Sequence, residues 1–315
     1  MTKPEISVVC PVYGCRDCLV SLTEAVRSTM DAASLTWELV LIDDRAPDAP
    51  WSLIAQLAQE DVRVRGVRLA RNHGQQLAIW AGLEAARGSW IVVIDCDLQD
   101  DPLIIPKLHC EATRSDVHAV IVDRGEWSDS RFRRWASDVF YRLIAILSGI
   151  RLQNVGNFGI YSRPMVEMLL RFEEQEVFLP IMVSLTGLKT VTVSVDRSDR
   201  LAGKSAYSFR RLLRLATSII IRFSDRPLKI SASLGLVFST FAGFASLYLL
   251  ARSIIGDFTV PGWASLVLSV WFLSGIIMLC LGIHGLYLSR VFAEVRRRPR
   301  MTIECSTFPP SPEDN

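Results

Sequence analysis

A short apolar run that ends in a cluster of carboxylates sets the strongest constraint on how this chain folds. Residues 90–94 read Trp-Ile-Val-Val-Ile, and Asp95-Cys96-Asp97 follows directly. An apolar, β-branched run bounded by Gly88 and by an acidic turn is typical of a buried strand. Open α/β sheets bind ligands at the carboxyl ends of their strands, so we expect Asp95 and Asp97 to lie at such a position.

Two chemical interpretations of these carboxylates are open. Two carboxylates one residue apart can hold a hard divalent cation, and such a cation can bridge the oxygens of a diphosphate. Alternatively, the stretch is an acidic turn without a metal, which leads into a helix that starts at Pro102. Features elsewhere in the chain are needed to separate these two interpretations.

Apolar strands alternate with amphipathic helices through the first 122 residues. The pattern predicts strands at residues 6–9, 37–42, 62–69, 90–94 and 118–122, and helices at 17–30, 51–60 and 75–86. This alternation predicts an α/β fold, with a mostly parallel sheet and helices on both faces. No Gly-x-Gly-x-x-Gly follows the first strand, so the dinucleotide-binding fingerprint is missing.

Polar or turn-forming groups follow the first, second and fourth of these strands: Pro11 and Tyr13, Asp43 and Asp44, and Asp95 and Asp97. Their expected meeting at one edge of the sheet favours a single site there. Arg124 follows the strand at 118–122 at the same edge. Further along, we expect a glycine-rich turn at 154–159, a helix at 164–171, a strand at 190–195 and a polar loop at 200–207.

Two long apolar runs in the last third of the chain predict membrane spans. The chain is 50% hydrophobic with a mean hydropathy of +0.27, and the excess lies at residues 230–250 and 263–288. At 1.5 Å per residue, each run is long enough to cross a hydrocarbon core of roughly 30 Å. Residues 208–224 mix arginines with leucines and isoleucines, so we expect an interfacial amphipathic helix before the first span.

Basic residues flank both runs on the same side. Arg222, Arg226 and Lys229 precede the first run, five arginines between residues 290 and 300 follow the second, and no secretory signal pattern opens the chain. The positive-inside rule therefore places both chain ends in the cytoplasm. We expect a multi-pass membrane protein with a cytoplasmic domain at 1–205, juxtamembrane helices at 206–229, two spans at 230–289 and a cytoplasmic tail at 290–315, disordered from Thr307.

Seven cysteines are scattered along the chain, which suits a reducing compartment. Cys15 and Cys18 form a Cys-x-x-Cys pair, but no second pair of ligands accompanies it. We therefore interpret this spacing as a coincidence rather than as a zinc site or a redox pair.

Five motifs occur in an order that resembles a known family: Pro11-x-Tyr13, Asp43-Asp44, Arg71-Asn72-x-Gly74-x-Gln76, Asp95-x-Asp97-Leu-Gln99-Asp, and Arg200-x-x-Gly203-x-Ser205. With the apolar tail, they resemble family 2 glycosyltransferases of the polyisoprenyl-phosphate type. Within that family, the chain is similar to dolichyl-phosphate mannose synthases and to bactoprenol glucosyltransferases. Its two-span tail resembles the bacterial members in particular. The resemblance covers residues 5–302 and implies a GT-A fold.

The resemblance also implies a reaction and its participants. A sugar would pass, with inversion, from a nucleotide sugar to polyprenyl (undecaprenyl) phosphate at the bacterial inner membrane, for cell-envelope modification. The likeness of the tail to glucosyl-type members implies a UDP-linked hexose donor. The family further implies Mg²⁺ or Mn²⁺ as cofactor and a homotetramer in the bilayer, and no nucleic acid is expected as a partner.

Site residues carry over by resemblance in three groups. The residues that hold the base and ribose are Pro11, Tyr13, Ile42 and Asp44. The residues that line the diphosphate are Asp95, Cys96 and Asp97, with Asp95, Asp97 and Gln99 at the metal. Groups near the phosphates are Arg124, Arg200, Lys204 and Ser205, and the catalytic candidates are Asp97, Asn157 and Arg200.

Departures from the family pattern leave two hypotheses open. Gly14-Cys15 replaces a common Asn-Glu, Lys204 stands two places from the usual lysine, and Asn157 stands where relatives often carry an aspartate proposed as a base. An amide cannot take a proton at neutral pH, so either Asn157 only orients the acceptor or sugar, or activity is weakened. A phosphomonoester with a second pKa of about 6 is already an anionic nucleophile. The alternative is a catalytically impaired scaffold that binds nucleotide or lipid for partner enzymes.

Overall fold

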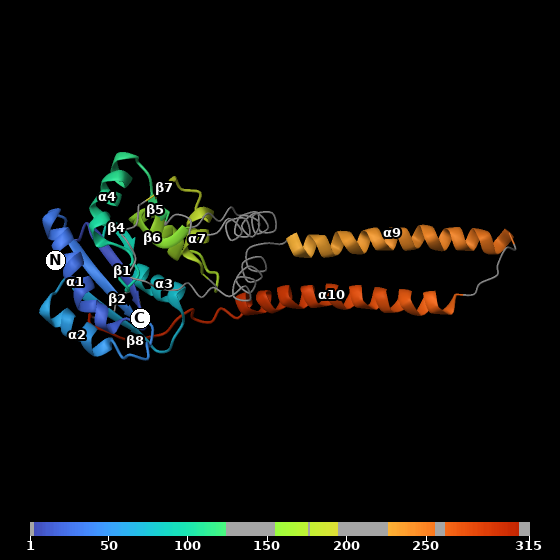
Figure 1. Ribbon diagram of the computed structural model, residues 1–315, viewed down its shortest axis with the longest axis horizontal. Helices are drawn as coiled ribbons and strands as arrows, with labels where there is room; N and C mark the ends of the chain where they lie inside the picture. Colours follow the sequence, from blue (N-terminus) through green and yellow to red (C-terminus); the bar gives the residue numbers. More distant parts are fainter. Residues whose placement is uncertain (1–2, 124–154, 176, 195–225, 256–261, 309–315) are drawn as a thin grey trace, which may run out of the picture. The chain divides into compact units, whose positions relative to one another are not determined.

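A computed structural model describes residues 3–123, 155–175, 177–194, 226–255 and 262–308 (Figure 1). The chain divides into two compact units. The first comprises Met1–Asp129, Leu152–Ala202 and Arg298–Asn315, and the second comprises Ser130–Arg151 and Gly203–Arg297. The polar loop expected at 200–207 and the interfacial helix expected at 208–224 lie outside the described residues.

An eight-stranded sheet in the order β7-β5-β6-β4-β1-β2-β3-β8 forms the centre of the first unit. Its strands are β1 (Ile6–Val12), β2 (Trp37–Asp43), β3 (Val64–Leu69), β4 (Trp90–Val93), β5 (Ala119–Asp123), β6 (Val155–Ser162), β7 (Thr190–Ser194) and β8 (Ile303–Ser306). The strands β1 to β4 are mutually parallel where they pair, with Val12 opposite Asp43 and Val9 opposite Val93. Their carboxyl ends therefore meet at one edge, as predicted.

Two antiparallel strands make the sheet mixed. β6 runs antiparallel to both β4 and β5, and it occupies the segment for which we expected a glycine-rich turn. That prediction was wrong because Gly159 serves a close contact rather than a turn: a Cβ added there would lie 2.9 Å from the backbone oxygen of Val120. Asn157 therefore lies on a strand beside β4.

The second antiparallel strand, β8, pairs with β3 and is the last strand on that side of the sheet. The predicted disorder from Thr307 is wrong for the first residues of that segment. The amide of Gly66 donates to the hydroxyl of Thr307 at 2.9 Å, and Arg65 lies over the ring of Phe308 at 3.7 Å. The remaining residues, 309–315, lie outside the described part of the chain.

Helices cover both faces of the sheet, as the alternating pattern predicted. On one face, α1 (Leu19–Ala32), α2 (Trp51–Glu60) and α4 (Ile105–Arg114) bury their apolar sides in a core with Ile6, Val8 and Cys10. On the other face, α3 (Gln75–Ala85) packs against β1 and β2. Gly82 permits this approach, since a Cβ there would lie 2.2 Å from Val9 Cγ1. The helices α6 (Arg163–Leu170) and α7 (Leu179–Leu185) adjoin each other, and α6 contacts α3.

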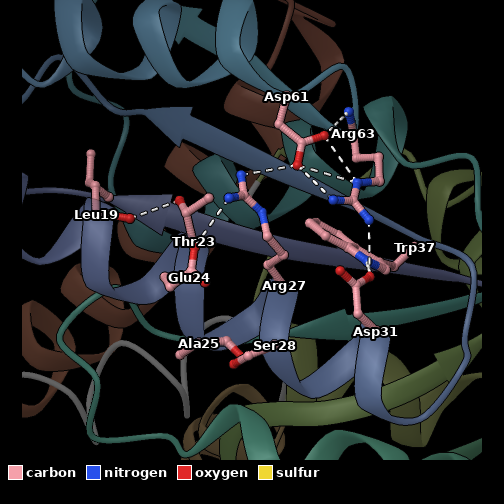
Figure 2. A network of polar contacts seen from close by, with 10 residues as sticks. All are labelled: Leu19, Thr23, Glu24, Ala25, Arg27, Ser28, Asp31, Trp37, Asp61 and Arg63. Carbon is pink, nitrogen blue, oxygen red and sulfur yellow. Dashed lines mark hydrogen bonds and ion pairs between the residues drawn. The ribbon is translucent and has the colours of Figure 1, made fainter.

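A network of ion pairs ties α1 to the chain just before β3 (Figure 2). Arg27 contacts Asp61 at 3.1 Å, and Arg63 contacts Asp61 at 2.9 Å and Asp31 at 3.0 Å. The indole of Trp37 donates to Asp31 at 2.9 Å. Hydrogen bonds from Arg63 hold the pKa of Asp61 below its ordinary value. These contacts stabilise the amino edge of the sheet, away from the ends of β1, β2 and β4.

The second unit contains two long helices, α9 (Arg226–Ile255) and α10 (Trp263–Val295). They meet at Phe238 and Phe272, whose rings pack edge to face at 6.4 Å. Both predicted apolar runs are therefore helical. Among the described residues, one stretch, Ser269–Val295, is long and apolar enough to cross a bilayer, whereas α9 contributes the shorter apolar stretch Leu228–Phe238.

Candidate active site

The carboxyl ends of β1, β2 and β4 bring the predicted residues to one edge of the sheet. Tyr13 follows β1 and is half exposed, Asp44 follows β2, and Asp95 follows β4 after one residue. Pro11 and Ile42 lie opposite each other in the ladder and are buried. Their backbones approach the edge, while the side chain of Ile42 faces Gly82 of α3.

The two aspartates after β2 hold the neighbouring loops. Asp43 accepts from the amide of Ala46 at 3.0 Å and contacts Arg68 at 3.3 Å. Asp44 accepts from the amides of His73 at 2.7 Å and of Gly74 at 2.8 Å. Burial raises the pKa of both carboxyls. Asp44 thus anchors the Arg-Asn-His-Gly loop whose last residue takes a φ of +88°, a conformation that favours glycine.

The four carboxylates after β4 form two pairs with different structural roles. Asp100 is buried and accepts from the amide of Asp95 at 3.2 Å, and Asp101 accepts from the amide of Leu103 at 2.9 Å to cap the short helix η2 (Pro102–Ile104). These two side chains shape the turn. Asp95 is partly exposed and Asp97 is exposed, and the carboxylate of Asp97 accepts a hydrogen bond from the amide of Gln99 at 3.1 Å.

The oxygen atoms at this turn are of the kind that hard divalent cations bind. No group of three His, Cys, Asp or Glu side chains converges within the described residues. Asp95, Asp97 and the side-chain oxygen of Gln99 instead offer two carboxylates and an amide. Mg²⁺ characteristically keeps several waters and binds through one or two carboxylates plus substrate phosphates, so a partial protein shell of oxygens suits it. Mn²⁺ accepts the same ligand types.

Two adjacent glutamines at the start of α3 connect the two halves of the site. Gln75 Nε2 donates to Asp95 Oδ1 at 2.7 Å, and Gln76 Nε2 donates to Asn157 Oδ1 at 2.9 Å. The amide of Leu179 donates to Gln76 Oε1 at 2.9 Å. Sequence reasoning placed Gln76 in a motif but assigned neither glutamine to the site, although the motif was the available signal.

The chain of two hydrogen bonds, from Leu179 to Gln76 and from Gln76 to Asn157, also fixes the orientation of the side-chain amides of Gln76 and Asn157. A backbone N–H can only donate, so the Gln76 atom facing Leu179 is oxygen and the other is nitrogen. The Asn157 atom that faces this nitrogen must then be its oxygen. The Asn157 NH₂ group consequently points away from Gln76, with its donors directed elsewhere.

A disulfide joins Cys15 to Cys96, with their Cα atoms 6.3 Å apart and a sequence separation of 81. The Cys-x-x-Cys spacing is therefore not a pair, since Cys18 is a free cysteine. Cys96, which is predicted to line the diphosphate, lies at this turn with its side chain nearly buried and its sulfur bonded to Cys15. Its role at the diphosphate stays a prediction, and the carboxylates on either side of it lie less buried than Cys96.

Four predicted site residues lie outside the described residues: Arg124, Arg200, Lys204 and Ser205. A cavity of about 810 Å³ lies at the opposite edge of the sheet, lined by Trp37, Glu38, Arg63 and Arg65 near the amino ends of β2 and β3 and by Arg87 among others. It shares none of the residues of the candidate active site, so it is a separate feature.

Residues 7–177 match the sequence pattern described as "Glycosyl transferase family 2", which covers the strands β2 to β6, all of β1 except Ile6, and every described site residue. The chain belongs to glycosyl transferase family 2. The resemblance drawn from the five motifs is therefore confirmed, and the mixed sheet with helices on both faces is its GT-A-like fold. As a member of this family, the protein is an enzyme of the glycosyltransferase class.

Relatives match this glycosyltransferase over nearly the full chain. A "Prophage bactoprenol glucosyl transferase homolog" of Escherichia coli (strain K12) is 34% identical, covering 95% of this chain and 98% of the relative. An "Undecaprenyl-phosphate 4-deoxy-4-formamido-L-arabinose transferase" of Aeromonas hydrophila is 32% identical, covering 95% and 92%. An uncharacterized glycosyltransferase of Bacillus subtilis (strain 168) is 30% identical, covering 96% and 94%.

Proposed function

We propose that this glycosyltransferase moves a hexose from a UDP-linked donor to undecaprenyl phosphate, with inversion, giving a polyprenyl-phosphate sugar for the cell envelope. The observation that carries the proposal is the glutamine pair of α3. Gln75 contacts the Asp95 carboxylate, and Gln76 contacts Asn157 on β6. The first residues of α3 therefore connect the carboxylates proposed to bind the donor diphosphate with the amide proposed to bind the acceptor. The printed names of the relatives support the lipid phosphate acceptor.

On the donor side, Pro11, Tyr13, Ile42 and Asp44 would border the base and ribose. Asp95, Asp97 and Gln99 would hold Mg²⁺ or Mn²⁺, which when bound offsets the charge that develops on the leaving diphosphate. Arg124, Arg200, Lys204 and Ser205 would approach the phosphates. Asp95 is already oriented by Gln75, so this carboxylate is positioned before the donor arrives.

On the acceptor side, Asn157 would orient the polyprenyl phosphate without taking a proton. Its oxygen is engaged by Gln76, which leaves the NH₂ donors for an anionic phosphate oxygen. The acceptor needs little activation, since its second pKa is about 6 and it is largely dianionic at neutral pH. Position, rather than general-base catalysis, is then the main contribution of Asn157.

The membrane arrangement belongs to the same proposal. Two helices, α9 and α10, would span the inner membrane with the glycosyltransferase unit and both chain ends in the cytoplasm, following the flanking arginines. The small residues Gly235, Gly275 and Gly282 within these helices would allow close helix packing in a homotetramer. The polyprenyl chain of the acceptor would remain in the bilayer.

The test combines binding and turnover of the full-length protein in detergent. A thermal-shift screen of UDP and GDP sugars, with and without Mn²⁺ or Mg²⁺, should show stabilisation by a UDP-hexose only when metal is present. The same donor should then yield a radiolabelled undecaprenyl-phosphate sugar. Binding without any lipid-linked product across all donors would instead favour the impaired scaffold, and product from GDP sugars alone would reject the UDP assignment.

Substitution of Asn157 tests how the acceptor is handled. Asn157→Asp keeps an oxygen for Gln76 but replaces the donors with a negative charge, so we expect kcat/KM for undecaprenyl phosphate to fall at least about tenfold. Asn157→Ala should lose a similar amount, while the donor KM stays near the wild-type value in both. Initial rates across acceptor and donor concentrations measure this. A gain of activity in Asn157→Asp would mean instead that a missing base limits the wild-type enzyme.

A further inference from the structure

The disulfide between Cys15 and Cys96 connects two turns of the proposed donor site. Cys15 lies two residues after Tyr13 in the loop that leaves β1, just before the short helix η1 (Arg16–Cys18). Cys96 lies between Asp95 and Asp97. The bond therefore joins the base side of the donor site to the carboxylates proposed to hold the metal.

Each turn has hydrogen bonds of its own, but both turns also carry exposed residues. Tyr13 is 54% exposed and Leu98 is 40% exposed, and Leu98 takes a φ of +59°, which residues with a side chain rarely adopt. The loop after β1 is tied by the amide of Arg16, which donates to Asp48 at 2.8 Å. The disulfide is the one covalent tie among the described residues between segments distant in sequence.

We propose that Cys15 and Cys96 are positioning residues whose disulfide holds the two donor-binding turns together, so that donor affinity depends on their redox state. This inference rests on the proposed function, because it assigns these turns to the nucleotide sugar. In the oxidised protein the turns are ordered before the donor binds. In the reduced protein the donor must order them, which weakens binding.

The chemistry balances with a low-molecular-weight disulfide, such as glutathione disulfide, as oxidant. Cys15 and Cys96 each lose one proton and one electron as their sulfurs bond, and the oxidant becomes two thiols by accepting two electrons and two protons. Reduction by a thiol reverses these steps through a mixed disulfide. Disulfides of cytosolic proteins are usually transient and catalytic or redox-sensing, which fits a reversible bond on the cytoplasmic unit.

Cys10, one of two free cysteines near these turns, does not compete for exchange. Cys10 is fully buried in β1, and burial, together with the nearby Asp95, Asp100 and Asp97, raises the pKa of its thiol. A buried thiol with a raised pKa is a poor partner in thiol–disulfide exchange. Cys18 is partly exposed and lies three residues after Cys15, which makes it a matched control.

The experiment compares full-length protein equilibrated with glutathione disulfide and with dithiothreitol. Calorimetric titration with UDP and with GDP, each in the presence of Mn²⁺, identifies the nucleotide that binds more tightly. Reduction of the protein should weaken the binding of that nucleotide roughly 3- to 10-fold. The donor KM should rise by the same factor, with kcat changed less than about twofold, since the tie contributes equally to the ground and transition states. Peptide mapping without reductant should find the Cys15 and Cys96 peptides linked.

Two variants separate positioning from other effects of oxidation. Cys15→Ser should bind nucleotide like the reduced wild type under both conditions, and Cys18→Ser should keep the full redox response. Equal affinity in both states, with the link confirmed by mapping, would overturn the inference, and so would free alkylation of Cys15 and Cys96 in the oxidised protein. Redox-dependent binding without transfer to polyprenyl phosphate would reject the proposed reaction while leaving this inference standing. Absence of nucleotide binding in either state would overturn both.

Discussion

Replacement of Asp97 by alanine should lower kcat/KM for transfer to undecaprenyl phosphate by about 10³-fold or more, the scale expected when several kcal/mol of charge stabilisation are lost. Asp97 is exposed at the carboxyl ends of the strands, and among the residues that the structure describes its carboxylate accepts a hydrogen bond only from the amide of Gln99. Little in the fold depends on it, so the loss would fall on the metal and the diphosphate. Radiolabel transfer at saturating Mn²⁺ measures the effect.

Asp101 provides a matched control in the same turn. Asp101→Ala removes the same charge four residues away, but this side chain caps η2 through the amide of Leu103. Loss of a cap costs about 0.5–2 kcal/mol of stability, and we expect turnover within a few-fold of wild type. Equal losses in the two variants would assign the effect to the general charge of the turn. Turnover above a tenth of wild type in Asp97→Ala would reject the metal role of Asp97.

The core strands could be predicted because each one is marked by the residues of the strand itself. The runs at residues 37–42 and 90–94 are β-branched and apolar, and both form central strands that are buried on each face. β1 runs on through Pro11 to Val12, beyond the predicted end at residue 9. Pro11 pairs in register with Ile42 near the end of the strand, where the missing N–H of proline is tolerated.

The parts of the site that could not be predicted depend on contacts between distant segments. The disulfide joins residues 81 apart, and the nearer Cys18 gave a misleading local pair. The strand β6 contains Gly159, whose contact with Val120 of β5 cannot be recognised without the neighbouring strand. The hydrogen bond between Gln76 and Asn157 follows from the same strand pairing. Register, rather than composition, decides these positions.

Replacement of Glu38 by alanine should lower the free energy of unfolding by about 3–5 kcal/mol, the range found when one partner of a buried ion pair is removed. Glu38 and Arg65 are 4% and 7% exposed, and their charged groups are 3.0 Å apart. Glu38 Oε1 also accepts from Ser7 Oγ and from the amide of Arg87, each at 2.6 Å. The variant would leave the Arg65 guanidinium buried without its carboxylate, although burial already lowers the pKa of Arg65.

The melting temperature of the detergent-solubilised protein should fall by roughly 6–20 °C for a loss of this size. Glu24→Ala is the control, since Glu24 contacts Arg27 from a side chain that is 65% exposed, and exposed pairs contribute about 1 kcal/mol at most. A Glu38→Leu, Arg65→Met double variant should melt higher than Glu38→Ala because no charge is left buried alone. The pair lies at the amino edge of the sheet, so transfer measured well below the melting temperature should stay near wild type. Melting of Glu38→Ala within a few degrees of wild type would show that water reaches Arg65 and that the pair does not secure this edge.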